Sequence, residues 1–386
     1  MDFQLSEEQR LLQQTVREFA DRECKPLAAQ WDRDARVPDD DVVRKMLGMG
    51  LVGMCLPQQY GGGGQDLLTA IICIEQLARI SPLCAAPVFE SNVGPVRVIE
   101  HFGTPEQRQR FIPRVCRGEM QISVGMTEAE AGSALTDLRT RAVKVDGGWR
   151  LSGRKVFCTG GGHSEAYMVY CRFNDVAGAK GIGALVVEKG TPGFSFGKQE
   201  QFMGMRGFPS CDLIFEDCLI PDENLVVAAG GFGSLMQCFD VERCGNATMA
   251  LGIATGALEV AAAYAMERQT FKKPIAERQA IQMMIADMAT RVDAARLLVY
   301  RAAVGSQSGF PSIRESSMAK VFANETAKAV TDMAMEILGG YGYTAEFPIE
   351  RMLRDSRGWP LAGGTLQIQK ILIAATVFGR TFDQRK

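Results

Sequence analysis

The sequence predicts an α+β protein in which two helical regions flank a central β region. Three observations support this order. Apolar residues recur with helical spacing from residue 5 to about 120, short β-branched or aromatic runs separated by glycine and proline follow, and Ala-, Met- and Leu-rich helical segments return after residue 230. A chain of 386 residues exceeds one ordinary domain. We expect an N-terminal helical domain (1–122), a β-barrel-like domain (123–229) and a C-terminal four-helix bundle (230–386).

Local signals at the ends of segments support each expected element. Ser6 followed by two glutamates predicts the start of the first helix, and Thr104 with Pro105 predicts the start of another. The glycine-rich stretch 56–64 cannot continue a helix and predicts a loop. In the β region, residues 146–148 (Asp-Gly-Gly) between alternating segments predict a tight hairpin.

Composition narrows the classes of partner. The net charge of −2 and the pI of about 5.9 give no basic surface for nucleic acid. We read no apolar run as a membrane span and no signal peptide at the N-terminus. Eleven dispersed cysteines without a C-x-x-C pair predict reduced, buried thiols, and two histidines offer no histidine-rich metal site. We therefore expect a cytoplasmic protein with no nucleic-acid or membrane partner and no metal.

Five motifs are candidates for ligand binding, although each also has an ordinary structural explanation. MTEAEAGSALTDLRT (126–140), FCTGGGHS (157–164) and ILGGYGY (337–343) fit turns or helix ends as well as ligand loops. MERQTFKKPIAERQAIQ (266–282) is either a solvated basic loop or a phosphate site at a helix start. CFDVERCGNATMALGIATG (238–256) carries glycines that predict close helix packing, and its Glu242 is by local pattern a surface residue. Together they indicate a phosphate-containing ligand between the β region and a helical bundle.

The segments together resemble the acyl-CoA dehydrogenase family along nearly the whole chain. The matching segments include DFQLSEEQ, LPQQYGG, MTEAEAGS, FCTGGG, MGMRGFP with LIFEDCLIPDENL, ERQTFKKPIAERQ, ILGGYGY, RMLRDSR and GGTLQIQ. The resemblance implies a fold of helical, β and helical domains, an FAD cofactor, an acyl-CoA substrate, an electron-transferring flavoprotein as electron acceptor, and a homotetramer or dimer of dimers.

The resemblance also implies the residues that bind FAD. They are, in chain order, Met126, Thr127, Gly132, Ser133, Phe157, Thr159, Arg268, Thr270, Phe271, Gln279, Glu336, Gly339, Gly340, Thr365 and Gln367. Those between 268 and 279 would reach the FAD of a neighbouring subunit. Ser133 and Arg243 would also contact the substrate. Some of these positions differ from the residues common in the family. Phe157 stands where the family often has Trp, and Glu336 where it often has Gln. Ala129 and Glu130 stand in place of Pro-Gly, and Ala134 in place of Asp.

The catalytic base is where this sequence departs most from the family. The family's reaction removes a thioester α-proton with a carboxylate while the β-hydrogen leaves as hydride to flavin N5. Most members place that Glu directly before a C-terminal Gly-Thr, where this chain has Gly363. A minority resembling isovaleryl-CoA dehydrogenase place it on the first long helix of the C-terminal domain, at the position of Glu242. The resemblance therefore implies Glu242 as the base, with the Gly363 N–H donating to the thioester oxygen.

Three alternatives remain open from the sequence. Parts of the chain, among them EAGSA, TGGGHS and LAGGTLQI, also resemble 3-sulfinopropionyl-CoA desulfinase, which binds FAD without net oxidation; that relative lacks the helix Glu and has an arginine before its SN dipeptide. Here PLCAAPVFESN (82–92) has no arginine. The enzyme would otherwise run as an enoyl-CoA reductase, or the chain would be a silent binding protein that keeps FAD. Gly363 removes a side chain beside the reacting carbons, which suits branched, cyclic or bulky acyl groups.

Overall fold

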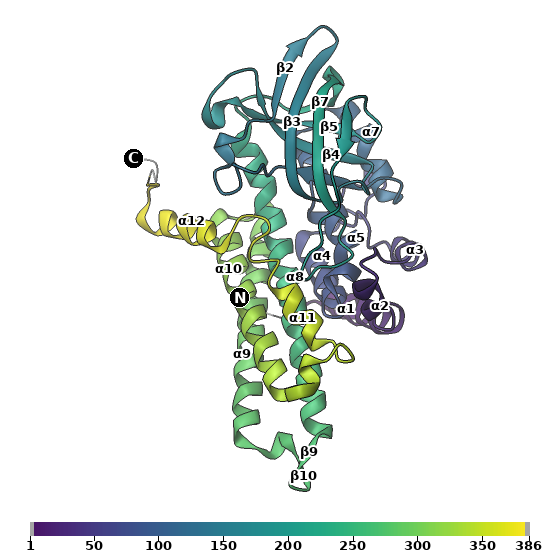
Figure 1. Cartoon of the computed structure of the whole chain (residues 1–386), viewed down its shortest axis with the longest axis vertical. Coiled ribbons are helices and arrows are strands. Elements are labelled where there is room, and N and C mark those ends of the chain that lie inside the picture. Colours follow the sequence, from purple (N-terminus) through teal and green to yellow (C-terminus); the bar gives the residue numbers. More distant parts are fainter. Residues whose placement is uncertain (1–3, 383–386) are drawn as a thin grey trace.

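The computed structural model describes residues 4–382. A sheet forms one end of the molecule, long C-terminal helices extend away from it, and the N-terminal helices pack against both (Figure 1). Asp2 and Phe3 of the first family segment lie outside the described residues. The order of helices, strands and helices confirms the predicted fold class.

The N-terminal region is helical up to residue 116. Its α-helices are α1 (Glu7–Phe19), α2 (Ala28–Arg33), α3 (Asp40–Gly48), α4 (Leu67–Ala78), α5 (Pro82–Val93), α6 (Val96–Phe102) and α7 (Pro105–Cys116). Both predicted helix starts are correct, because Ser6 and Thr104 each form a capping box with the glutamine three residues later. The loop predicted at 56–64 contains only a single short 3₁₀ turn.

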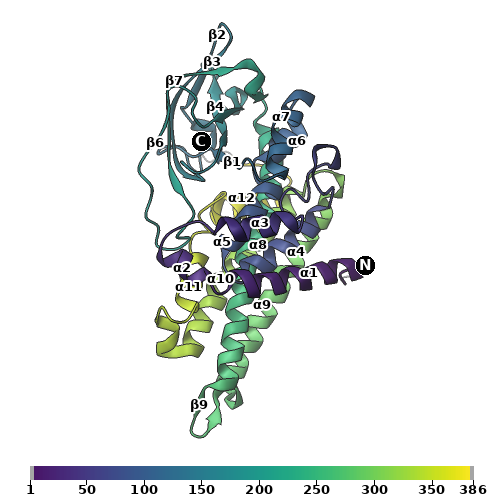
Figure 2. The same cartoon turned by 90° about the vertical axis from the view of Figure 1, so that its right-hand side faces the viewer.

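The middle region forms one mixed sheet. Its strands are β1 (Ile122–Gly125), β2 (Arg141–Val145), β3 (Gly148–Thr159), β4 (Ala166–Phe173), β5 (Ile182–Glu188), β6 (Phe194–Phe196), β7 (Ser210–Pro221) and β8 (Leu225–Val227). The order is β6-β7-β3-β2-β4-β5-β8, and β1 pairs in parallel with β4. The predicted hairpin is present, since Val145 pairs with Gly148 across a two-residue turn. The described strands form no closed barrel, so the barrel-like expectation holds only as an open, curved sheet (Figure 2).

The C-terminal region contains three long helices and two shorter ones. They are α8 (Phe232–Glu267), α9 (Gln279–Val304), α10 (Ile313–Leu338), α11 (Ile349–Ser356) and α12 (Leu366–Phe378). A small hairpin of β9 (Gln269–Thr270) and β10 (Lys273–Pro274) joins α8 to α9 at the far end of the molecule from the sheet (Figure 1). Helix α12 lies nearer the sheet, beside the opposite half of α10.

Helix α8 is the central helix, and its glycines allow neighbouring backbones to approach. A Cβ added to Gly252 would lie 2.5 Å from the Ala78 Cβ, and one added to Gly256 would lie 2.0 Å from the Arg79 carbonyl oxygen at the end of α4. These distances are far below van der Waals contact, so the predicted close packing of this helix is confirmed.

Two expectations about buried chemistry can be compared with the structure. Helix α8 is long and apolar enough to cross a membrane, so the expectation that no apolar segment has the length of a membrane span is wrong. However, 61% of the apolar window of α8 is buried, as in the core helix of a globular fold. All eleven cysteines are free thiols and ten of them are buried, which confirms the prediction of reduced, buried thiols.

Candidate active site

Glu242 lies on α8, one turn before the point where this helix packs against α5. At that point a Cβ on Gly245 would lie 2.5 Å from the Val93 Cγ2 atom. Glu242 is partly exposed whereas both of its chain neighbours are buried. Among the described residues its carboxylate has neither a hydrogen bond nor an ion pair. Such a carboxylate, held on a rigid helix and left without a partner, is free to act on a ligand.

Gly363 lies in the turn before α12, and a side chain at this position would point toward Glu242. Its φ of +64° is in the left-handed region that favours glycine. A Cβ added there would lie 3.8 Å from the Glu242 Oε1 atom, 3.6 Å from the Asn246 Nδ2 atom and 3.2 Å from the Lys320 Nζ atom. The empty side-chain position of residue 363 and the carboxylate of residue 242 therefore occupy neighbouring points in space.

Lys320 fixes this turn from α10. Its ammonium group donates to the carbonyl oxygens of Ala362, Gly363 and Gly364 at 2.5, 2.6 and 2.8 Å. Three acceptors require three N–H donors, which only the protonated amine provides, so we assign Lys320 as a cation even though burial lowers its pKa to about 7. This role could not be predicted from the sequence, because a lysine on a helix is ordinarily a solvated surface residue.

The surroundings of Glu242 suit a general base. Burial raises the pKa of the Glu242 carboxyl to about 7, while the positive charges of Lys320 and Arg243 oppose that rise. A base whose pKa is near the working pH combines a useful ionised fraction with sufficient basicity. Arg243 is itself buried and forms an ion pair with Asp240, so its positive charge acts on Glu242 from within the core.

A second carboxylate, Glu90, lies across from Glu242 and was not singled out in the sequence. Glu90 precedes Val93 on α5 by three residues, as Glu242 precedes Gly245 on α8, and Val93 and Gly245 are in contact. Burial, together with the negative charge of Glu242, raises the pKa of Glu90 to about 8. The signal that could have identified Glu90 is a glutamate within an otherwise apolar helix.

Glu90 also lines a cavity of about 310 Å³ between the N-terminal helices and the sheet. Thr159 and Gly160, at the end of β3, also line this cavity, together with Phe208. Thr159 is a predicted flavin residue. The cavity therefore joins the predicted flavin side to the carboxylate that interacts with Glu242.

The predicted flavin loop lies next to the end of β3. The Thr127 carbonyl accepts a hydrogen bond from the Val156 N–H at 2.8 Å, which brings this loop beside Phe157. Gly132 and Ser133 are exposed, Met126 is buried, and the Phe157 ring is 61% exposed with a φ of +56°. An exposed ring on a left-handed backbone offers an apolar face to a flat ligand.

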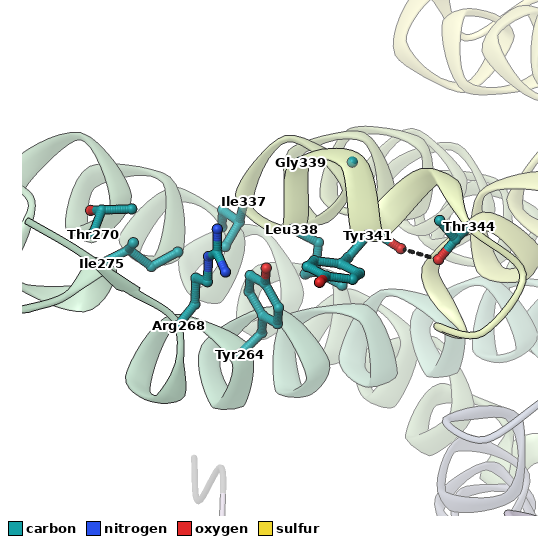
Figure 3. Close-up of a pocket in the computed structure, with 10 residues that line it drawn as sticks. Tyr264, Arg268, Thr270, Ile275, Ile337, Leu338, Gly339, Tyr341 and Thr344 are labelled. Carbon is teal, nitrogen blue, oxygen red and sulfur yellow. Dashed lines mark hydrogen bonds between the residues drawn. The ribbon is translucent and has the colours of Figure 1, made fainter.

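A second group of predicted FAD residues meets at the far end of the helical region. Arg268, Thr270, Gly339 and Gly340 line one cavity of about 490 Å³, with Tyr264 and Tyr341 beside them (Figure 3). A Cβ on Gly339 or Gly340 would meet no atom within 4 Å, so the glycines leave open space there. The Arg268 side chain points between the two helices toward α10. A guanidinium beside such open space suits a phosphate-bearing ligand.

The remaining predicted residues lie apart from that cavity within one chain. Thr365 caps α12 through the Ile368 N–H, and Gln367 is exposed on the same helix, toward the sheet rather than the β9–β10 hairpin (Figure 1). Phe271 at the hairpin is 91% exposed, and Gln279 and Glu336 are exposed as well. The structure thus brings the predicted cofactor residues together as separate groups rather than as one site.

Three family models together match most of the chain. The N-terminal, middle and C-terminal domains of acyl-CoA dehydrogenase match residues 6–119, 123–218 and 229–378. The chain belongs to the acyl-CoA dehydrogenase family. Members of this family are oxidoreductases and use FAD, and the donors and open space around Arg268 and Gly339 fit such a phosphate-bearing cofactor.

Relatives and solved structures agree with the family assignment. The short-chain specific acyl-CoA dehydrogenase of Clostridium acetobutylicum is 38% identical over 98% of this chain and 100% of its own length. The 3-sulfinopropanoyl-CoA desulfinase of Paraburkholderia xenovorans is 38% identical over 100% of this chain and 99% of its length. The butyryl-CoA dehydrogenase of Megasphaera elsdenii superposes with a TM-score of 0.94 at 33% identity, covering 98% of this chain and 100% of that structure.

Proposed function

We propose that the protein is an FAD-dependent acyl-CoA dehydrogenase that introduces the α,β double bond with Glu242 as base. The proposal rests on the distance of 3.8 Å between a Cβ atom added to Gly363 and the Glu242 Oε1 atom. Glu242 accepts the α-proton of the thioester. FAD, when bound, supplies the acceptor for the β-hydrogen and its electron pair, so that the acyl chain loses two electrons and the flavin gains them.

The turn at residues 362–364 would hold the thioester oxygen. The Gly363 N–H has no acceptor among the described residues, and the Lys320 ammonium group fixes the carbonyls on either side of it. An oriented N–H donor stabilises the enolate oxygen that develops as the α-proton leaves. Packing of α8, α5 and the turn around Glu242 shields the base in part from water and favours the raised pKa of its carboxyl.

The separation of the cofactor residues supports a site shared between subunits. Residues near Thr159 would bind the flavin ring of one FAD, while Arg268, Thr270 and Phe271 would reach an FAD held mainly by a neighbour. The exposure of Phe271 supports this arrangement, because an aromatic ring 91% exposed on a monomer is available for an interface. We further place the protein in the cytoplasm as a homotetramer that passes electrons to an electron-transferring flavoprotein.

Gly363 favours acyl groups with bulk near the reacting carbons. The family position that usually carries the base is here only a hydrogen atom, which leaves room beside the Glu242 carboxylate. Branched or cyclic acyl groups would use that room. The cyclohex-1-ene-1-carbonyl-CoA dehydrogenase of Geobacter metallireducens, 39% identical over 95% of this chain and 97% of its own length, acts on such a group by its name.

Anaerobic mixing of the purified holoenzyme with acyl-CoAs tests the proposal. Straight, branched and cyclic acyl-CoAs are added in turn, and loss of the oxidised flavin absorbance is followed, with the enoyl-CoA product measured by mass spectrometry. We expect bleaching with at least one class. Tight binding of acyl-CoAs without bleaching or product would overturn the dehydrogenase assignment in favour of a binding protein.

The same assay separates the two other reaction classes. Sulfite release from a sulfinated acyl-CoA, without flavin bleaching, would indicate the desulfinase reaction suggested by one relative. Reoxidation of chemically reduced enzyme by an enoyl-CoA, faster than bleaching by the matching acyl-CoA, would indicate the reductase direction suggested by the acryloyl-CoA reductase of Anaerotignum propionicum, which is 38% identical over 98% of this chain and 97% of its own length.

A further inference from the structure

The second carboxylate, Glu90, has no role in the proposed reaction, which needs one base. Its side chain has no hydrogen bond or ion pair in the part of the chain that the structure describes, although it lies within the packed region between α5 and α8. Leaving a carboxyl group in such a place without a partner costs stability. A group retained at that cost is a candidate for ligand recognition.

The position of Glu90 places it along the path of an acyl chain. Glu90 and Glu242 stand on facing helices, each three residues before the contact between Val93 and Gly245. Glu90 also lines the cavity of about 310 Å³ whose lining includes Thr159. A substrate held with its α-carbon at Glu242 would extend its distal atoms toward this cavity and pass Glu90.

The walls of this cavity carry several carboxyl groups, and His163 is the basic side chain among its described lining residues. Asp40 and Glu165 line it in addition to Glu90, and none of its described lining residues is lysine or arginine. The two cations near Glu242 are already engaged, Lys320 with three carbonyl groups and Arg243 with Asp240. An amine on the ligand would favour the ionised form of Glu90 and a hydroxyl would donate to it, whereas a ligand carboxylate would be repelled once Glu90 ionises, above a pH of about 8, the value to which burial and Glu242 raise its pKa.

We propose that Glu90 is a specificity-determining residue that selects acyl groups carrying a hydrogen-bond donor, an amine or a hydroxyl, beyond the β-carbon, and that rejects acyl groups ending in a carboxylate. This inference rests on the proposed dehydrogenase function and names the substrate class of the same site. Helix α5 also lines the cavity with the polar Ser91 and with three apolar residues, Leu83, Ala86 and Pro87, which would pack against the methylene groups between thioester and donor.

The test compares four acyl-CoAs with five-carbon acyl chains in the anaerobic flavin assay at pH 9, above the pKa of about 8 of the Glu90 carboxyl, so that this group is ionised. Valeryl-CoA has no polar end, 5-hydroxyvaleryl-CoA and 5-aminovaleryl-CoA carry the two donors, and glutaryl-CoA carries a carboxylate. We expect kcat/KM for the better of the two donor substrates to exceed that for valeryl-CoA by at least tenfold, and glutaryl-CoA to be the poorest substrate. The two donor arms distinguish an amine from a hydroxyl as the preferred group.

Variants of Glu90 separate recognition from a purely structural role. Glu90→Gln keeps the shape and hydrogen bonding of the side chain, and Glu90→Leu removes both charge and hydrogen bonding. We expect Glu90→Leu to lose most of the tenfold preference, chiefly through a higher KM for the two donor substrates. Glu90→Gln should reduce the preference for the amine more than for the hydroxyl, because it removes charge but leaves an acceptor.

Glu165→Gln is the matched control, because it removes a negative charge from the same cavity and retains an acceptor for the Gln121 N–H. It should preserve the substrate order. If valeryl-CoA bleaches the flavin as well as the donor substrates do, or if Glu90→Gln and Glu90→Leu change all four substrates equally, the role of Glu90 is refuted while the dehydrogenase function stands. If no acyl-CoA of any class bleaches the flavin, the proposed function itself fails.

Discussion

The Lys320 Nζ atom lies 2.6 Å from the carbonyl oxygen of Gly363 and so ties α10 to the turn that faces Glu242. Lys320→Met removes this tie and leaves three carbonyl groups without their donor, which should lower the free energy of unfolding by about 2–4 kcal/mol. It also removes a positive charge that lowers the pKa of Glu242, so the pH profile of flavin reduction should move to higher pH by roughly one unit. Thermal unfolding and stopped-flow reduction measure the two effects.

Lys328→Met on the same helix is the control, because its surface ion pair with Glu325 contributes little. An unchanged pH profile in Lys320→Met would contradict the electrostatic influence of Lys320 on the base.

Glu242→Gln should remove flavin reduction by substrate while leaving FAD bound. The amide is nearly the same shape as the carboxylate but cannot accept the α-proton, so the reduction rate should fall by at least 10²–10⁴-fold. Rapid mixing measures the rate, and the absorbance of the purified protein measures its flavin content. Glu267→Gln, at the exposed end of the same helix, should react like wild type. Retained reduction in Glu242→Gln would disprove the assignment of the base.

The rate of reduction should rise with pH and level off above about 7. The Glu242 carboxyl must be ionised to accept a proton, and burial raises its pKa from 4.5 to about 7. The charged groups around it are Glu90 on α5, Arg243 on α8 and Lys320 on α10, with Tyr170 on β4 nearby. A pH series of stopped-flow reduction in wild type checks this, and a flat profile from pH 5 to 9 would argue against a base with a raised pKa.

Glu242→Gln should also be more stable than wild type above pH 7. Because the folded pKa of Glu242 exceeds its unfolded value of 4.5, the native state binds more protons than the unfolded state between pH 4.5 and about 7, and stability falls as pH rises through that range. The variant lacks this loss, so it should gain about 2–3 kcal/mol at pH 8 and almost nothing at pH 4. Denaturant unfolding at both pH values measures the difference.

Gly363→Ala should impair bulky substrates more than straight ones. The new Cβ would lie 3.8 Å from the Glu242 Oε1 atom and would occupy the space left for an acyl branch. We expect kcat/KM to fall about tenfold for α- or β-branched acyl-CoAs and by less than threefold for straight chains. Gly379→Ala is the control, because Gly379 has a similar φ of +68° but no atom within 4 Å of its added Cβ. Equal losses for both substrate types would contradict the assignment of this space to the acyl group.

Arg268→Ala should weaken FAD retention and subunit assembly together. Arg268 lines the cavity of about 490 Å³ near Gly339, and its guanidinium is the group there that suits a phosphate. Flavin content per chain and sedimentation velocity are measured in parallel with Arg291→Ala, an exposed arginine on α9. Full flavin content in a normally assembled Arg268→Ala protein would count against a site shared between subunits.

Local chemistry made much of the fold predictable from the sequence. The Asp-Gly turn between β2 and β3, the caps Ser6 and Thr104, and the glycines of α8 each act over a few residues, so the pattern alone predicts them. The closure of the sheet was not predictable, because an open and a closed sheet have the same alternation along each strand.

The candidate site was harder to predict because it depends on contacts between distant segments. Glu242 was identified through family resemblance, since its local pattern resembles that of a surface residue. Lys320 and Glu90 gained their significance only when α10, α5 and the turn at Gly363 came together. The separation of Thr365 and Gln367 from Gly339 could not be predicted either, because it depends on the lengths of the helices and not on the motif that contains these two residues.

The neighbouring positions of Gly363 and Glu242 also bear on how such enzymes diverge. A Cβ atom at residue 363 would lie 3.8 Å from the Glu242 Oε1 atom, so a carboxylate on the turn and a carboxylate on α8 can reach the same region. The reacting carbons and the flavin would keep their places during such an exchange. The base can therefore be on either segment while the reaction geometry stays the same. Related enzymes can in this way change the space beside the substrate without changing the reaction.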